Sequence, residues 1–152
     1  MRPKLKELLL RVEKEIKIAE RVVEKNKKAA NLIGGGMASG YSIAGDLEHA
    51  RNTALLSEKR LDGLKNLQQV LTIFLAQPAA IINPPCFLNV RYEGAEAKEL
   101  FCVRNPIHFP DLNLVSADSP LGKALLNHKS GDTFSYLLSD GRKITGEIIL
   151  VE

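Results

Sequence analysis

The segment "GDLEHARN", residues 45–52, carries the side chains best suited to chemistry, because Asp46, Glu48 and His49 lie within four positions. Carboxylate oxygens are the hard ligands that Mg²⁺ prefers, and metal-assisted phosphoryl transfer depends on them. A structural interpretation is open as well: Asp46 would favour the positive end of a helix dipole, and Glu48 would be a solvated helix residue. His49 has no second His or Cys within ligand spacing, so we predict no metal site in the free chain.

Two long amphipathic helices are predicted on either side of a glycine-rich stretch that precedes this segment. Steps of four and three residues trace a first apolar seam, interrupted only by Asn26, through Leu5, Leu9, Val12, Ile16, Ala19, Val23, Asn26, Ala30 and Ile33. A second, more polar seam follows through Leu47, Ala50, Ala54, Ser57, Leu61, Leu64, Gln68 and Leu71. Such heptad spacing is typical of coiled coils, and two helices joined by a short loop pack antiparallel. Residues 1–77 are therefore predicted to form an antiparallel coiled-coil hairpin with a tip loop at residues 34–46.

The remainder of the chain changes its hydrophobic period from helical to alternating. Three prolines within residues 78–85 predict a linker without regular structure. Alternating segments in residues 86–152 predict strands, and "DSPLGKALL" predicts a short helix capped by Asp118 or Ser119. The expected fold class is α+β, with the hairpin followed by a mixed β-sheet that carries one short helix.

Composition limits the classes of function. The 152 residues carry a net charge of +3 and no Trp, which argues against direct nucleic-acid binding by charge or by base stacking. Basic residues outnumber acidic ones in residues 1–28, either as a solvated face or as a surface for an acidic partner. Cys86 and Cys102 lack metal-site spacing and are predicted as buried neighbours across a hairpin, which leaves a disulfide open. With no apolar run that resembles a signal peptide or spans a membrane, we predict a reducing, cytoplasmic location.

The stretch "LVSADSPLGKALLNHKSGDTFSYLLSDGRKITGEIILVE", residues 114–152, resembles the C-terminal domain of the Gre-type (GreA/GreB) transcription elongation factors. The shared features are a strand ending in Ser, the run "DSPLGKALL", a "GD" pair and a final hairpin. The resemblance implies an FKBP-like domain. It also implies that the coiled coil enters the secondary channel of bacterial RNA polymerase, with Asp118, Ser119 and Pro120 near the contact at the channel rim.

The tip of the family's coiled coil carries a Gly-Asp-Leu-x-Glu-Asn motif. Here Gly45, Asp46 and Leu47 match, but His49 occupies the position of the glutamate, and Glu48 lies one residue early. The resemblance implies that Asp46, with Glu48, acts on Mg²⁺ inside the polymerase active site, with no cofactor in the free protein. The chain would be a non-enzymatic elongation factor, and two outcomes are open: it stimulates transcript cleavage, or it regulates the polymerase without cleavage.

Two other functions are compatible with the sequence. An FKBP-like domain could be a peptidyl-prolyl isomerase, but those sites need an aromatic floor. The aromatic residues available are Phe87, Tyr92, Phe101, Phe109, Phe134 and Tyr136, several of which must serve the core. Alternatively the first helix could dimerise, with Leu8 and Leu10 flanking its seam; the intramolecular hairpin predicts a monomer.

Overall fold

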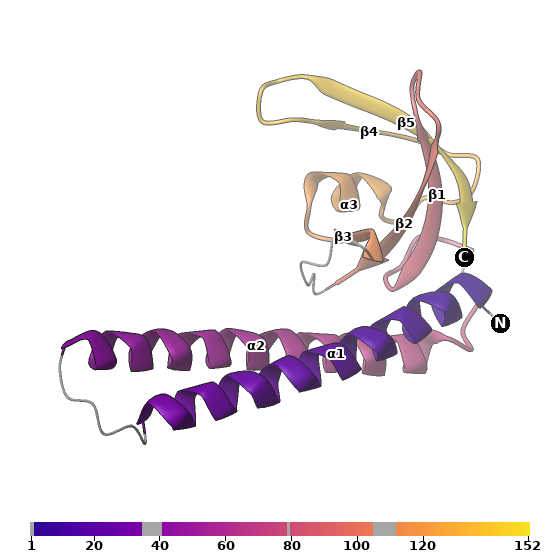
Figure 1. Ribbon diagram of the computed structural model, residues 1–152. Coiled ribbons are helices and arrows are strands. Elements are labelled where there is room, and N and C mark those ends of the chain that lie inside the picture. The colour runs from indigo at the N-terminus through magenta and orange to yellow at the C-terminus, as the bar shows by residue number, and fades with distance from the viewer. Residues whose placement is uncertain (1, 35–40, 79, 105–111) are drawn as a thin grey trace. The chain divides into compact units, whose positions relative to one another are not determined.

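The computed structural model describes residues 2–34, 41–78, 80–104 and 112–152, apart from the side chains of residues 30–34 and 41–44. In chain order the elements are α1 (Pro3–Gly34), α2 (Tyr41–Phe74), β1 (Cys86–Tyr92), β2 (Ala97–Val103), β3 (Leu114–Ser116), α3 (Pro120–Leu125), β4 (Thr133–Leu137) and β5 (Lys143–Val151) (Figure 1). The chain forms two compact units: a hairpin unit, Arg11–Gln68, and a sheet unit, Met1–Leu10 with Gln69–Glu152. The predicted α+β class is confirmed, whereas the predicted domain boundaries at residues 77 and 85 stay a prediction.

The hairpin unit consists of two antiparallel helices held by the predicted seam. Its buried apolar residues are Val12, Ile16, Ala19 and Val23 on α1 and Leu61, Leu64 and Leu67 on α2. Ion pairs join the helices from Lys27 to Glu58 at 3.1 Å and from Glu20 to Lys65 at 4.0 Å. Residue numbers rise along one helix as they fall along the other, so these pairs fix the antiparallel direction.

The predicted tip loop is too long. α2 begins at Tyr41, so Gly45 and Asp46 lie inside a helix, and Gly34 closes α1. A glycine inside a helix costs only about 1 kcal/mol relative to alanine, which the rest of a 34-residue helix tolerates. From the sequence we also expect the apolar residues Met37, Tyr41 and Ile43 to pack across the end of the hairpin, but their side chains lie outside the described set.

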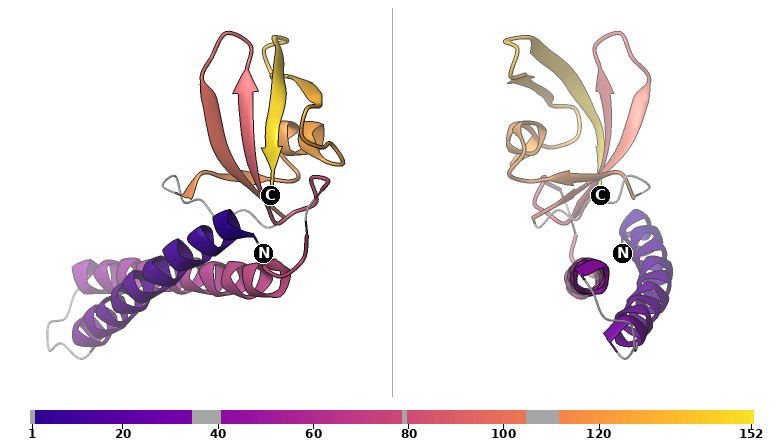
Figure 2. Two further views of the ribbon diagram at one scale, coloured as in Figure 1. Left: turned by 90° about the vertical axis from the view of Figure 1, so that its right-hand side faces the viewer. Right: turned by 60° about the vertical axis from the view of Figure 1, so that its left-hand side comes forward.

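The sheet unit is built on five strands in the order β3-β2-β1-β5-β4. The pair β2–β3 is parallel and the other neighbours are antiparallel, so the predicted mixed sheet is confirmed. From the alternation in "LNLVS" we expect a strand over residues 112–116, but Asn113 adopts a φ of 51° and β3 begins at Leu114. The sheet curls, and α3 lies against it on the inner side (Figures 1 and 2). The core between them contains Ile82, Cys86, Leu88, Val90, Cys102, Ala117, Leu125, Phe134, Ile148 and Val151.

The segment predicted as a linker, residues 78–85, is bonded to the sheet unit. Ile82 is fully buried, its backbone N–H donates to the carbonyl of His128 at 2.8 Å, and its carbonyl accepts from Asn127 at 3.1 Å. Prolines do prevent regular structure here, as predicted, but the apolar side chain of Ile82 still contributes to the core.

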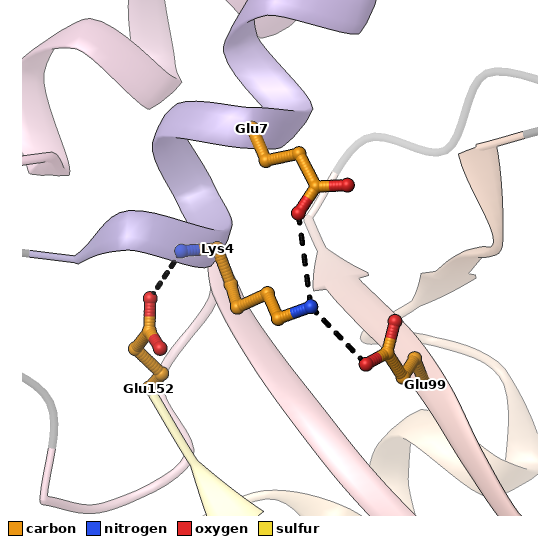
Figure 3. A network of polar contacts seen from close by, with 4 residues as sticks. All are labelled: Lys4, Glu7, Glu99 and Glu152. Atoms are coloured by element: carbon orange, nitrogen blue, oxygen red, sulfur yellow. Dashed lines mark hydrogen bonds and ion pairs between the residues drawn. The ribbon is translucent and has the colours of Figure 1, made fainter.

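The first turn of α1 also belongs to the sheet unit. The guanidinium of Arg2 donates to the backbone carbonyls of Pro85 and Glu152, both at 2.9 Å. The Lys4 ammonium lies 3.2 Å from Glu99 and 3.7 Å from Glu7, and the Lys4 backbone N–H donates to the carboxylate of Glu152 (Figure 3). The hydrogen bond with Glu99 is the main reason that the pKa of Lys4 is raised. The base of α1 is therefore held on the sheet by several polar contacts.

Leu8 is fully buried in this unit, whereas Leu9 is half-buried, so the first step of the seam falls on Leu8 instead of Leu9. Leu10 is exposed. The alternative of a dimer through Leu8 and Leu10 therefore has only one of its two residues at the surface.

Candidate functional site

The first candidate site is the start of α2, where Asp46, Glu48 and His49 are all exposed. Successive helix residues are rotated by about 100°, and Leu47, between the two acids, is the half-buried seam residue. Asp46 and Glu48 therefore flank the seam on opposite sides, about 200° apart around the helix axis. The structure does not bring the two predicted carboxylates onto one face.

His49 lies closer to Asp46 than Glu48 does. Residues three apart on a helix are surface neighbours, so His49 occupies the surface position next to Asp46. The His49 carbonyl accepts a hydrogen bond from the Thr53 hydroxyl at 2.9 Å, which involves only the backbone of His49. Among the described residues, Asp46 has no ion pair, and no group of three or more His, Cys, Asp or Glu side chains could hold a metal ion. This face of α2 therefore carries one exposed carboxylate without an ion pair to a described residue, and His49 is at the neighbouring position.

The second candidate site is the turn between β3 and α3, where Ser119 caps the helix. Its hydroxyl accepts from the backbone N–H of Gly122 at 3.0 Å and donates to the carbonyl of Ser116 at 2.7 Å. Its extended backbone, with φ −68° and ψ 159°, is that of an N-cap, and Pro120 follows at the start of the helix. Capping by Ser119, one of the two predicted options, is confirmed.

Asp118 is held in this turn by its backbone only, since its N–H donates to the Ser116 hydroxyl at 3.1 Å. Its carboxylate is exposed, as is the ring of Pro120. Asp118 and Pro120 thus project from a turn whose backbone is fixed by Ser116 and Ser119. Such a turn can offer a partner one negative charge and one rigid apolar ring.

Gly122 determines how closely this turn approaches β3. A Cβ at Gly122 would lie 1.9 Å from the carbonyl oxygen of Ser116, which no side chain tolerates. Sequence reasoning missed both Ser116 and Gly122. The available signal was the glycine of "SPLG", which falls inside a predicted helix where alanine would be the better helix former.

The third feature is an open groove of about 390 Å³ beside α3, β4 and β5. It is lined by Ala124, His128, Thr133, Phe134, Ser135, Lys143 and Thr145. A prolyl isomerase site needs several aromatic residues, but among the described lining residues only Phe134 is aromatic. Phe87 and Phe101 instead pack on each other at 5.3 Å, Tyr92 packs on Phe134 at 5.9 Å, and Phe109 lies outside the described residues. The lining does not favour isomerase activity.

The two cysteines are directly opposite each other in the β1–β2 register, as predicted. Both thiols are free and buried. The pKa of Cys86 is raised, first by its hydrogen bond with Cys102 and then by burial. A raised pKa keeps this thiol protonated and unreactive at neutral pH. Within the parts of the chain that are described, no helix is both long and apolar enough to span a membrane.

Comparison with known proteins finds a match to the family "Transcription elongation factor, GreA/GreB, C-term" over residues 90–152. A curated relative, transcription elongation factor GreA of Saccharopolyspora erythraea, is 34% identical over 76 residues. These residues are 49% of this chain and 47% of the relative, so the alignment spans about half of each protein.

Two solved structures are similar at low identity. Gfh1 of Thermus aquaticus has a TM-score of 0.41 at 19% identity, covering 93% of this chain and 92% of that one. A GreA/GreB factor from Nitrosomonas europaea has a TM-score of 0.41 at 23% identity, covering 59% of this chain and 78% of that one. The family match over the sheet, and not these distant similarities, supports the assignment. Residues 90–152 match the GreA/GreB C-terminal family, and the resemblance of this chain to the Gre-type transcription elongation factors is confirmed.

Proposed function

We propose that this chain binds bacterial RNA polymerase and modulates elongation by inserting its helical hairpin into the secondary channel. The GreA/GreB domain at residues 90–152 and the hairpin that precedes it support this proposal. The chain itself is not proposed to be an enzyme. Its site of action would be the cytoplasm, where the polymerase is, and the hairpin would act as a monomer.

The observation that carries the proposal is the exposed carboxylate of Asp46 near the start of α2. The polymerase active site uses two divalent ions, and an incoming carboxylate can complete the coordination of a loosely held Mg²⁺. Asp46 matches the family motif and has no ion pair with a described residue, so no such pair has to break before it binds metal. The chain supplies the carboxylate, and the polymerase supplies the metal.

The same geometry favours the non-cleaving alternative as a second candidate function. A pair of carboxylates on one face would hold a metal ion and orient water, but Glu48 is rotated about 200° from Asp46. The residue beside Asp46 is His49, which is neutral or cationic and has no oxygen donor in its side chain. With one carboxylate on that face, we expect weak cleavage or none, and occupation of the channel as the main effect.

Asp118 and Pro120 are proposed as the contact with the polymerase at the channel rim. Asp118 would pair with a basic side chain, and the exposed ring of Pro120 would pack beside it. Ser119 would act indirectly by fixing the backbone of the turn through its bonds to Gly122 and Ser116.

The proposal is tested in a stalled, backtracked transcription complex, with transcript cleavage and competition for the secondary channel measured on the same samples. The informative variants are Asp46→Asn, His49→Glu and Glu48→Gln. We expect His49→Glu to raise cleavage at least tenfold, because it restores the second carboxylate three residues from Asp46. Asp46→Asn in the His49→Glu background should abolish that gain, and Glu48→Gln should change little.

Competition separates the two candidate functions. If the wild type competes for the channel and cleaves weakly or not at all, the channel-occupying function is supported. If the wild type cleaves strongly and Asp46→Asn abolishes the cleavage, the stimulating function is supported. If the wild type neither competes nor binds polymerase, the proposed function is wrong.

A further inference from the structure

The strand β4 forms one edge of the sheet, and no described strand pairs with its outer side. β4 is the last strand in the order, and β5 is the strand that pairs with it. The backbone N–H of Leu138 donates to Arg142, and that of Ile148 donates to Asp132, both at 2.8 Å. Bonded and non-bonded positions alternate in an antiparallel pair, so Phe134 and Tyr136 also bond to β5. Thr133, Ser135 and Leu137 then direct their backbone N–H and carbonyl groups away from the sheet.

This free edge borders the open groove of about 390 Å³. Ala124 and His128 line it beside α3, and Thr133 and Ser135 line it on β4. The side chains of Thr133, Ser135 and Leu137 are all exposed. A groove between a helix and an unpaired strand edge has the geometry in which an extended peptide adds one more strand.

The charge of the groove selects the kind of peptide. Lys143 contributes a cation, and Thr133, Ser135 and Thr145 contribute hydroxyls. None of the described lining residues carries a carboxylate. The neighbouring acids are already bonded: Asp132 accepts from the Lys129 N–H at 3.0 Å, and Glu147 pairs with Arg91 at 2.9 Å. Lys143 has no ion pair with a described residue. An acidic side chain would therefore meet a free ammonium group and hydroxyl donors.

His128 adds a polar group to the helix side of the groove. Its Nδ1 lies 3.0 Å from the carbonyl oxygen of Leu126, which fixes the proton on Nδ1 in the neutral ring. Nε2 is then left as an acceptor for a peptide N–H or hydroxyl.

We propose that the groove between α3 and the free edge of β4 binds an extended, acidic peptide segment of a partner protein as an added strand. The backbone of Thr133, Ser135 and Leu137 would supply the pairing, and Lys143 would select acidic side chains. The turn that holds Asp118 is at the start of α3, whereas the groove is beside Ala124 and His128, which come later. Neither Asp118 nor Pro120 is among the described residues that line the groove, and the test of the groove does not depend on polymerase.

The test uses the full chain and a capped peptide of sequence Thr-Glu-Val-Glu-Val-Glu, with Thr-Lys-Val-Lys-Val-Lys as its matched control. Titration is followed by the amide NMR signals of the protein. We expect the acidic peptide to shift the Thr133, Ser135 and Leu137 amides and to slow their exchange with solvent. The lysine peptide should bind more weakly, and an acidic peptide with alternate N-methylated amides should not bind, because it cannot pair as a strand.

Two protein variants test the same contacts. Lys143→Glu should weaken binding about three- to tenfold, with Lys17→Glu on α1 as the control that leaves it unchanged. Ser135→Pro removes one edge N–H at a position where proline is tolerated, and should also weaken binding. Circular dichroism reports whether the Ser135→Pro variant folds. If it does not fold, the N-methylated peptide still tests strand pairing, because it leaves the protein unaltered.

Other outcomes overturn the proposal. Equal binding of the acidic and lysine peptides would contradict selection of acidic side chains by Lys143. Changes in amide signals confined to residues away from β4 would show that the peptide binds elsewhere. Concentration-dependent dimerisation that protects the β4 amides without peptide would assign the edge to a second copy of the chain.

Discussion

The hairpin unit and the sheet unit position their candidate residues in different ways. In the hairpin, Asp46 lies on the outer surface of a long helix, and its place depends on a repeating apolar seam. In the sheet unit, Asp118 projects from a turn whose backbone is fixed by hydrogen bonds of Ser116 and Ser119 and by the close approach of Gly122 to β3. Substitutions at the hairpin surface should therefore change function with little effect on stability, whereas substitutions around Asp118 should change both.

The largest difference in stability between the two units is expected from one glycine substitution in each. Gly122→Ala should destabilise the fold by about 3 kcal/mol, because the new methyl group would overlap the Ser116 carbonyl. Gly45→Ala is the matched control. Nothing lies within 4 Å of a Cβ added at this position, so the free energy of unfolding should rise by up to about 1 kcal/mol. Denaturant unfolding measures both. A neutral Gly122→Ala would show that the turn does not need this close approach.

Removal of the helix cap should have a smaller effect. Ser119→Ala removes the acceptor for the Gly122 N–H and should lower the free energy of unfolding by about 1 kcal/mol. Ser119→Asp keeps an oxygen at the cap and should recover most of this loss. If alanine and aspartate were equally destabilising, the capping role assigned to Ser119 would be wrong.

Alkaline pH should weaken the sheet unit by a comparable or smaller amount. Burial, and secondly the hydrogen bond with Tyr136, raises the pKa of Tyr92 from 10.0 to about 12. The folded state holds this proton more tightly, so the stabilising contribution is complete below pH 10 and is lost between about pH 10 and 12. After allowance for its partial exposure, we expect a loss of about 1 kcal/mol.

Unfolding measured from pH 9 to 12 tests this expectation. Tyr92→Phe should flatten the curve in that window, and Tyr136→Phe should flatten it less, because burial of Tyr92 remains. A Tyr92→Phe curve parallel to that of the wild type would contradict the shift.

The smallest effect is expected from an ion pair on the hairpin surface. Lys27 and Glu58 lie 3.1 Å apart, but the Lys27 side chain is exposed and that of Glu58 is partly exposed. A double-mutant cycle with alanine at each position should give a coupling of less than about 0.5 kcal/mol. A coupling above about 1 kcal/mol would show that surface pairs, and not only the seam, hold the two helices together.

The hairpin was largely predictable from the sequence, because the spacing of its apolar residues repeats. Val12, Ile16 and Leu64 are buried where the seam placed them. The start of α2 is not predictable from the glycines alone, because a helix accommodates a single glycine such as Gly45. The spacing does not distinguish Leu8 from Leu9, since neighbouring leucines fit the seam almost equally well, and the structure buries Leu8.

The candidate sites were predictable only in part. The capping pattern identified Ser119, since it depends on adjacent residues. To predict that Asp46 and Glu48 point in different directions, one must know that both lie in a helix and that Leu47 faces the seam. The groove could not be predicted, because Lys143, Ser135 and His128 come from separate elements that only the folded sheet unit brings together.

The most direct test of the central claim is where residue 46 lies in the transcription complex. An iron chelate attached through Asp46→Cys generates hydroxyl radicals that cut nearby RNA, and the same label on Leu137→Cys, at an exposed position of β4, is the control. The buried Cys86 and Cys102 should not react with the label under native conditions. We predict that the label at position 46 cuts RNA near its 3′ end within the polymerase, and that the label at position 137 does not. Equal cutting from both positions, or none from position 46 in a complex that contains the bound factor, would contradict delivery of Asp46 to the active site.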